Sequence, residues 1–215
     1  MRYLLLLPLL TLLALPVSGQ STYYSQATGD FSATATWNTV DDGTGAAPAS
    51  GHEMATNNTY IIQTGHTITV DKDINVDILS IGDDTGAGEQ LTLGTTAITM
   101  TVNGKLAVRG DGNLRVDGSG AVTHTVTLNK DVFNEGVIRF WEDTDSYADV
   151  TMQGGISTSY SGSQNNEDNN RFRNLTIQGG SARQLSLDLR IEGDFSIAGN
   201  TPVSVDRNLF IAGDF

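Results

Sequence analysis

Short runs of alternating apolar and polar residues fill the chain from Tyr60 onward. The runs are only a few residues long, are rich in β-branched side chains, and are separated by Gly, Asn or Asp. Alternation with a period of two predicts strands that bury one face. The clearest runs lie at residues 60–62, 67–70, 78–81, 91–93, 98–102, 106–108 and 114–116. No window after residue 20 keeps an apolar period of 3.6, so we expect almost no helix.

Several runs share the pattern Leu-x-(Val/Ile)-x-Gly, beginning at Leu106, Leu114, Leu175, Leu189 and Leu209. The segment 189–195 recurs, with changes, at 209–215, a shift of 20 residues. A repeat of short strands at such a period indicates a β-solenoid, in which each coil stacks ~4.8 Å above the last and buries its apolar side chains as ladders. We therefore predict an all-β parallel β-helix over residues 59–215. The competing fold is an antiparallel sandwich, whose strands also recur about every 8–12 residues.

Two segments depart from this pattern. Residues 20–58 carry aromatic side chains but little alternation, and we interpret them as an N-terminal cap folded over the end of the solenoid. Residues 153–171 are mostly Gly, Ser, Asn and acidic residues, so we expect a lateral loop without a strand. The sequence stops at Phe215 in the middle of a repeat with no visible terminal cap. This predicts that the chain is truncated and is the N-terminal fragment of a longer protein.

The first nineteen residues have the features of a signal peptide. Arg2 precedes an apolar run from Leu4 to Leu15, and small residues follow Pro16. The run is too short to cross a ~30 Å hydrocarbon core as a helix, so cleavage before Gln20 is favoured over an uncleaved anchor. We therefore expect a secreted or cell-surface protein.

Charge and cysteine content narrow the choice of partners. The net charge is −13, and loss of Arg2 with the signal peptide makes it −14. An acidic surface repels phosphate backbones and anionic lipid, so we expect neither nucleic-acid binding nor membrane insertion after cleavage. With no cysteine in the sequence, an exported chain must rely on packing and hydrogen-bonded ladders for stability.

The N-terminal half carries a family resemblance in the order of its motifs. Thr28-Gly29-Asp30-Phe31-Ser32 precedes Ala35-Thr36-Trp37, and Gly65-His66-Thr67-Ile68-Thr69-Val70 follows a Pro/Gly-containing loop. This order resembles the start of large secreted bacterial adhesin-like surface proteins and is similar to their eight-glycine domain, over roughly residues 22–116. The resemblance implies a right-handed parallel β-helix and a surface or released adhesin-like protein. It brings no shared catalytic residues, and the long spacing from Trp37 to Tyr60 sets this chain apart.

One aromatic–acidic patch suggests contact with a carbohydrate. Trp141 could stack on a sugar ring, and Glu142 and Asp143 could serve as acid and base of a glycosidase. A charged turn with Trp141 packed against the solenoid explains the same residues, and we assign no catalytic residue. Trp141, Glu142, Asp143 and, in the expected lateral loop, Tyr160 are the candidate ligand contacts. Arg171 and Arg173, a close basic pair, are interpreted as the start of a strand.

Clusters of carboxylates raise the question of calcium. They comprise Asp41–Asp42, Asp71/Asp73/Asp77, Asp83–Asp84, Glu142/Asp143/Asp145/Asp149 and Glu167–Asp168. Calcium takes about six to eight oxygen ligands, but no segment has the spacing of a dedicated calcium loop. Solvated acidic turns are the simpler interpretation, so no metal ligand and no cofactor is assigned, and calcium is the one cofactor left open.

Two further motifs have structural explanations. Arg109-Gly110-Asp111 spells an integrin-type tripeptide, but Gly110-Asp111 matches the Gly-Asp that ends other repeats. His52, His66 and His124 are too scattered for a zinc site.

Two functions therefore remain. The first is a non-enzymatic structural or adhesin-like module of a larger surface protein, with an extracellular glycan or protein as ligand. The alternative is a carbohydrate-binding or polysaccharide-degrading module.

Overall fold

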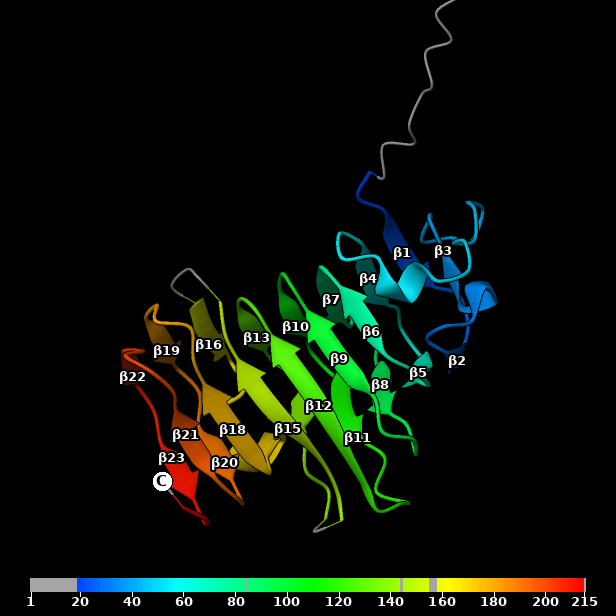
Figure 1. Cartoon of the computed structure of the whole chain (residues 1–215). Coiled ribbons are helices and arrows are strands. Elements are labelled where there is room, and N and C mark those ends of the chain that lie inside the picture. Colours follow the sequence, from blue (N-terminus) through cyan, green and yellow to red (C-terminus); the bar gives the residue numbers. More distant parts are fainter. Residues whose placement is uncertain (1–18, 84, 144, 155–157, 215) are drawn as a thin grey trace, which may run out of the picture.

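The computed structural model describes residues 19–83, 85–143, 145–154 and 158–214 as a stack of short strands (Figure 1). The predicted signal peptide lies outside these residues except for Gly19, as does Asp84.

The strands form three parallel sheets, each receiving every third strand of the chain. Sheet A contains β1 (Thr22–Ser25), β3 (Trp37–Asn38), β4 (Thr59–Ile62), β7 (Ile78–Ile81), β10 (Leu106–Val108), β13 (Val132–Asn134), β16 (Thr158–Gly162), β19 (Arg183–Leu185) and β22 (Val203–Val205). Sheet B contains β2 (Gly29–Asp30), β5 (Thr67–Val70), β8 (Gln90–Leu93), β11 (Asn113–Val116), β14 (Val137–Arg139), β17 (Asn170–Phe172), β20 (Leu189–Ile191) and β23 (Leu209–Ile211). Sheet C contains β6 (Ile74–Val76), β9 (Thr99–Val102), β12 (Val122–Leu128), β15 (Ser146–Met152), β18 (Asn174–Ile177) and β21 (Phe195–Ile197).

This order defines a β-solenoid with six three-stranded coils, from β4–β6 to β19–β21. Strand pairs between coils are parallel, and the one antiparallel pair of named strands in the described ranges joins β1 to β3. The parallel solenoid is thus confirmed and the antiparallel sandwich is wrong. Its right-handedness stays a prediction. Regular helix in the described ranges is limited to three 3₁₀ turns, at η1 (Thr34–Thr36), η2 (His52–Met54) and η3 (Glu167–Asn169).

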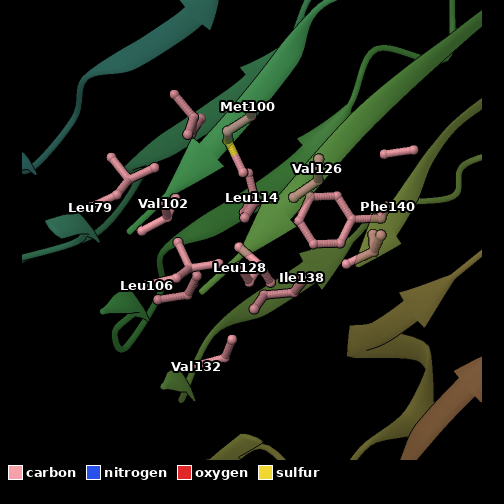
Figure 2. Packing of buried hydrophobic residues seen from close by; sticks show 14 of the residues in the cluster. Leu79, Met100, Val102, Leu106, Leu114, Val126, Leu128, Val132, Ile138 and Phe140 are labelled. Carbon is pink, nitrogen blue, oxygen red and sulfur yellow. The ribbon is translucent and has the colours of Figure 1, made fainter. Parts of the chain in front are cut away.

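Alternation explains the core, because each strand turns every second side chain inward. On sheet A, Leu79 pairs with Leu106, which pairs with Val132 on the next coil, and all three are buried. Sheet C supplies Met100 and Val126 in the same way. Figure 2 shows these side chains gathered between the sheets, and one continuous apolar cluster runs through the coils.

The predicted repeat is confirmed at the C-terminal end only. Leu189 pairs with Leu209 and Ile191 with Ile211, 20 residues apart. Paired residues of neighbouring middle coils instead lie 23 to 32 positions apart, as in Gln90–Asn113 and Ile138–Asn170. The Leu-x-(Val/Ile)-x-Gly pattern therefore marks single strands on all three sheets, and the turns between strands vary in length.

Residues 20–58 add strands to the solenoid and enclose an aromatic cluster. β1 and β2 pair in parallel with β4 and β5, and β3 forms the edge of sheet A. Phe31, Trp37 and Tyr60 pack with ring centroids 4.8–5.0 Å apart, and all three are buried. The indole Nε1 of Trp37 donates to the Phe31 carbonyl at 2.7 Å, which satisfies its buried donor.

The prediction of a strandless loop at 153–171 is wrong. β16 lies within this segment, pairs with β13 and β19, and continues sheet A, and β17 begins at Asn170. Its pattern is hard to recognise because the inward positions here include polar side chains. Tyr160 Oη and Asn134 Nδ2 both donate to Asn170 Oδ1, at 2.8 and 2.7 Å, and all three residues are buried.

Candidate functional site

The predicted aromatic–acidic patch lies at the corner where sheet B turns into sheet C. Phe140 points inward and is buried, whereas Trp141 and Glu142 are partly exposed and Asp143 is exposed. Trp141 forms an antiparallel bridge with Tyr147, so the turn folds back as a small hairpin. We call Trp141, Glu142, Asp143 and Tyr147 the Trp141 corner.

Two cations stack on the aromatic rings of the Trp141 corner. Arg171 Cζ lies 4.2 Å from the centroid of the Trp141 ring, and Arg173 Cζ lies 5.8 Å from the Tyr147 ring. Guanidinium groups at such distances are attracted to the ring face. The sequence interpretation of Arg171 and Arg173 as the start of a strand holds for β17 and β18, but it missed their place beside the aromatic side chains.

The two carboxylates of the corner have different environments. Asp143 Oδ1 accepts from the backbone N of Asp145 at 2.9 Å and of Ser146 at 2.7 Å, which fixes the turn. Glu142 Oε1 is buried and has no hydrogen-bond partner in the described part of the chain. The pair therefore does not present two equivalent carboxylates to a substrate, and Asp143 serves the backbone.

Tyr160 does not belong to this site, and its prediction as a ligand contact is wrong. Its ring is fully buried in the interior on β16, where it packs against Phe172 at 6.0 Å between ring centroids. Burial also raises the pKa of its phenol far above the ordinary value. The side chain stabilises the core and cannot reach a ligand at the surface.

The outer face of sheet B carries a feature that the sequence analysis did not find. Arg115 pairs in register with Arg139, Arg139 with Arg171, and Arg171 with Arg190. Because paired residues on neighbouring parallel strands point to the same side, the four side chains form a row along the solenoid axis. We call Arg115, Arg139, Arg171 and Arg190 the arginine row.

The arginine row is electrostatically unfavourable by itself. Neighbouring strands lie about 4.8 Å apart, and two unit charges at this separation repel by about 1 kcal/mol even in bulk water. The chain as a whole has only 12 Lys and Arg residues. A third of them thus lie in one row, where anionic partners are needed to offset the repulsion.

The chain supplies partners of its own to Arg139 and Arg190, which flank Arg171 in the arginine row. The η3 turn packs against β14, β17 and β20. Arg139 Nε donates to the Asp168 carbonyl at 2.9 Å, and Arg190 Nη1 lies 3.3 Å from the Asp168 carboxylate. Arg190 also pairs with Glu192, whose hydrogen bond and charge raise the pKa of Arg190. A hollow of about 350 Å³ lies beside Arg190, lined by Glu167 and Phe210 among others.

Other members of the arginine row lack such partners. The Nε atoms of Arg115 and Arg171 and the indole Nε1 of Trp141 are buried, and none has a hydrogen-bond partner among the residues that the structure describes. Asp117 lies near enough to Arg115 for its charge to contribute to a lowered Asp117 pKa, after the larger effect of hydrogen bonds from Ser119. Buried donors without a partner are a cost to the folded chain.

The acidic turns use their oxygens on the chain itself. Asp71 accepts from Ser32 N and Oγ, and Asp73 accepts from Thr99 N at 2.7 Å. Burial pushes the pKa of Asp71 upward, but the Ser32 hydrogen bonds outweigh it and leave this pKa lowered. Within the described ranges, three or more His, Asp or Glu side chains never gather closely enough to hold a metal ion.

The remaining motifs occupy turns or the interior. Gly110 lies in the turn from sheet A to sheet B with φ +49°, whereas Gly193 lies in the turn from sheet B to sheet C. The expected equivalence of these two Gly-Asp pairs is therefore wrong. His52 and His124 are buried, and His66 Nδ1 lies 2.8 Å from Ser25 Oγ.

No helix in the described part of the chain is long and apolar enough to span a bilayer. Searches among family models, curated proteins and solved structures gave no match to this chain.

Proposed function

We propose that the chain is a non-enzymatic, exported β-solenoid module of a larger secreted or cell-surface protein of the adhesin-like type. The proposal rests on the structural roles of side chains in the described part of the chain. Their apolar side chains form one continuous ladder core, and carboxylates such as Asp71 and Asp143 hold backbone turns. Such a scaffold presents side chains at fixed spacing along a stiff axis, which suits adhesion and spacing.

Within this proposal, residues 20–58 act as the N-terminal cap. The short antiparallel strand β3 ends sheet A, and the Phe31, Trp37 and Tyr60 rings cover the adjacent interior. Covering an open strand edge hinders pairing with other chains.

The second candidate is a carbohydrate-degrading module centred on the Trp141 corner. It is favoured by Glu142 Oε1, which is buried without a partner beside an aromatic ring. In this second candidate Glu142 supplies the acid and Trp141 stacks on the sugar ring.

Incubation of the exported chain with a panel of polysaccharides separates the two candidates. The adhesive module leaves the number of reducing ends unchanged over a long incubation. New reducing ends that disappear in Glu142→Gln, with Glu135→Gln as a charge-matched control, would contradict the non-enzymatic proposal and establish the second candidate. Mass spectrometry of the exported chain tests its processing, and a mature N-terminus at Gln20 is the expected result.

A further inference from the structure

The arginine row concentrates positive charge in an otherwise acidic protein. Four side chains at unequal spacing in the sequence come into register on β11, β14, β17 and β20. The net charge of the chain is −13, and Asp117, Asp168 and Glu192 lie beside the row, yet four arginines share this one face. A row of fixed cations along one axis is complementary to a polymer that carries anions at regular intervals.

The donors that lack partners lie on two different elements of this face. Arg115 belongs to β11, and Arg171 belongs to β17 and stacks on Trp141 from the corner after β14. Arg115 and Arg171 are partly exposed although their Nε atoms are buried, so an external carboxylate would meet the accessible remainder of each guanidinium group. Arg171 stacks on the Trp141 ring and the indole Nε1 is buried, so a sugar ring would meet the part of the indole that stays exposed.

Asp168 indicates which anion the row accepts. Its carboxylate lies 3.3 Å from Arg190 Nη1, and the neighbouring Glu192 also pairs with Arg190. The chain thus engages Arg190 with carboxylates of its own and Arg139 with the Asp168 carbonyl, whereas the Nε atoms of Arg115 and Arg171 have no hydrogen-bond partner among the described residues. Carboxylate and guanidinium match in shape and form bidentate pairs, which makes Arg the suitable residue for this recognition.

We propose that the outer face of sheet B, from Arg115 to Arg171 and the Trp141 corner, binds an acidic polysaccharide whose sugar units carry carboxylates. The polymer lies along the solenoid axis, its carboxylates on the guanidinium groups and one sugar ring against Trp141. This inference rests on the proposed function and names its ligand class. Nucleic acid is disfavoured, because the remaining surface is strongly acidic and repels a phosphate backbone.

Calorimetric titration of the exported chain with polygalacturonate oligomers tests the site. Arg115→Gln and Arg171→Gln are each expected to weaken binding at least tenfold. Arg207→Gln removes the same charge from an exposed turn before β23, outside the arginine row, and is expected to change Kd less than twofold. Arg171→Lys keeps the charge without the planar fork and should also bind more weakly than the unaltered chain. Thermal unfolding of each variant shows whether it is folded.

The comparison ligands make the result decisive. Neutral dextran should not bind, and single-stranded DNA should bind at least tenfold more weakly than polygalacturonate. The inference is overturned if folded Arg115→Gln and Arg171→Gln bind like the unaltered chain, if Arg207→Gln loses as much affinity as they do, or if DNA binds equally well. Binding of heparin without binding of polygalacturonate would overturn the carboxylate assignment. Cleavage of a bound polysaccharide would contradict the non-enzymatic function and leave this binding site standing. If polygalacturonate is neither bound nor cleaved, the binding site is overturned and the non-enzymatic function stands.

Discussion

Buried polar side chains in this solenoid fall into two kinds. Asn134, Tyr160 and Asn170 satisfy one another, and Asn170 Nδ2 also donates to the Gln164 and Asn166 carbonyls. His124 is different, because it is fully buried and neither ring nitrogen has a partner in the part of the chain that is described. Burial alone lowers the pKa of His124, since removal from water disfavours the charged ring.

Replacement of His124 is therefore expected to stabilise the protein. His124→Leu removes two unsatisfied nitrogens and should raise the free energy of unfolding by about 1–3 kcal/mol at pH 7.5. Because the folded pKa lies below the ordinary histidine value of about 6.5, the native state loses stability as the pH falls below about 6.5 toward that lowered pKa. The gain in the variant should accordingly be larger at pH 5.5.

Urea unfolding of both proteins at the two pH values provides the measurement. His52 is buried as well and its pKa is lowered chiefly by burial, so the variant should keep part of the acid sensitivity. A variant that is less stable than the unaltered chain at both pH values would show that the His124 ring is satisfied in solution.

Single glycines set how closely neighbouring coils approach. A Cβ on Gly136 would lie 2.2 Å from the Gly112 carbonyl oxygen on the preceding coil, which is backbone and cannot move aside cheaply. Gly136→Ala should lower the free energy of unfolding by at least about 2 kcal/mol. A Cβ on Gly120 would meet Val122 at 3.7 Å, which is an ordinary contact. Gly120→Ala should therefore change the free energy of unfolding by no more than about 0.5 kcal/mol. Equal thermal unfolding of the two variants would contradict the coil spacing described above.

At the scale of elements, the polar network around Asn170 holds β16, the strand that the sequence pattern did not predict. Asn170→Ala would remove the acceptor of Tyr160 Oη and the donor to the Gln164 carbonyl, whereas Asn134 Nδ2 keeps the Asn169 carbonyl and the Asn166 carbonyl keeps Asn169 N. We expect a loss of about 2–5 kcal/mol, because each buried polar group left unpaired costs about 1–3 kcal/mol. Limited proteolysis should also show faster cleavage near residues 163–169. Asn166→Ala, at an exposed cap residue of η3, is the control and should change stability much less.

The same elements show how far sequence patterns reach. The strands around Leu79, Leu106 and Leu189 were predictable, because apolar alternation and the 20-residue recurrence report a buried face directly. β16 was not, since its inward Tyr160 meets asparagines instead of an apolar ladder. An alternation of apolar and polar residues carries no signal where the core itself is polar.

The candidate site was predictable only in part. Trp141, Glu142 and Asp143 are neighbours in sequence, so composition alone drew attention to them. The arginine row escaped notice because its members are separated by 24, 32 and 19 residues. Unequal turns between strands conceal such a row until the register of each coil is known.

At the scale of the whole molecule, stability is expected to come from ladders and core packing, with the acidic turns satisfied by backbone donors. We predict that a chelator shifts the thermal unfolding midpoint of residues 20–215 by less than about 2 °C. The reason is that Asp71, Asp73 and Asp143 already accept hydrogen bonds that fix their turns. Circular dichroism with and without the chelator gives the answer, and a drop of 10 °C or more would show that calcium braces the turns.

The register of sheet B underlies both the solenoid and the proposed ligand site. It is tested most directly by disulfide formation between β14 and β17, in a chain that has no cysteine of its own. Arg139 and Arg171 are in register, so Arg139→Cys with Arg171→Cys places two Cα atoms about 4.8 Å apart, within the range that a disulfide spans. In the control pair, Val137→Cys with Arg171→Cys, the second cysteine lies two residues out of register and about 8 Å away, beyond that range. We predict rapid cross-linking of the first pair under mild oxidation, read out by mass spectrometry, and little cross-linking of the second. Preferential cross-linking of the control pair would contradict the register and, with it, the arginine row.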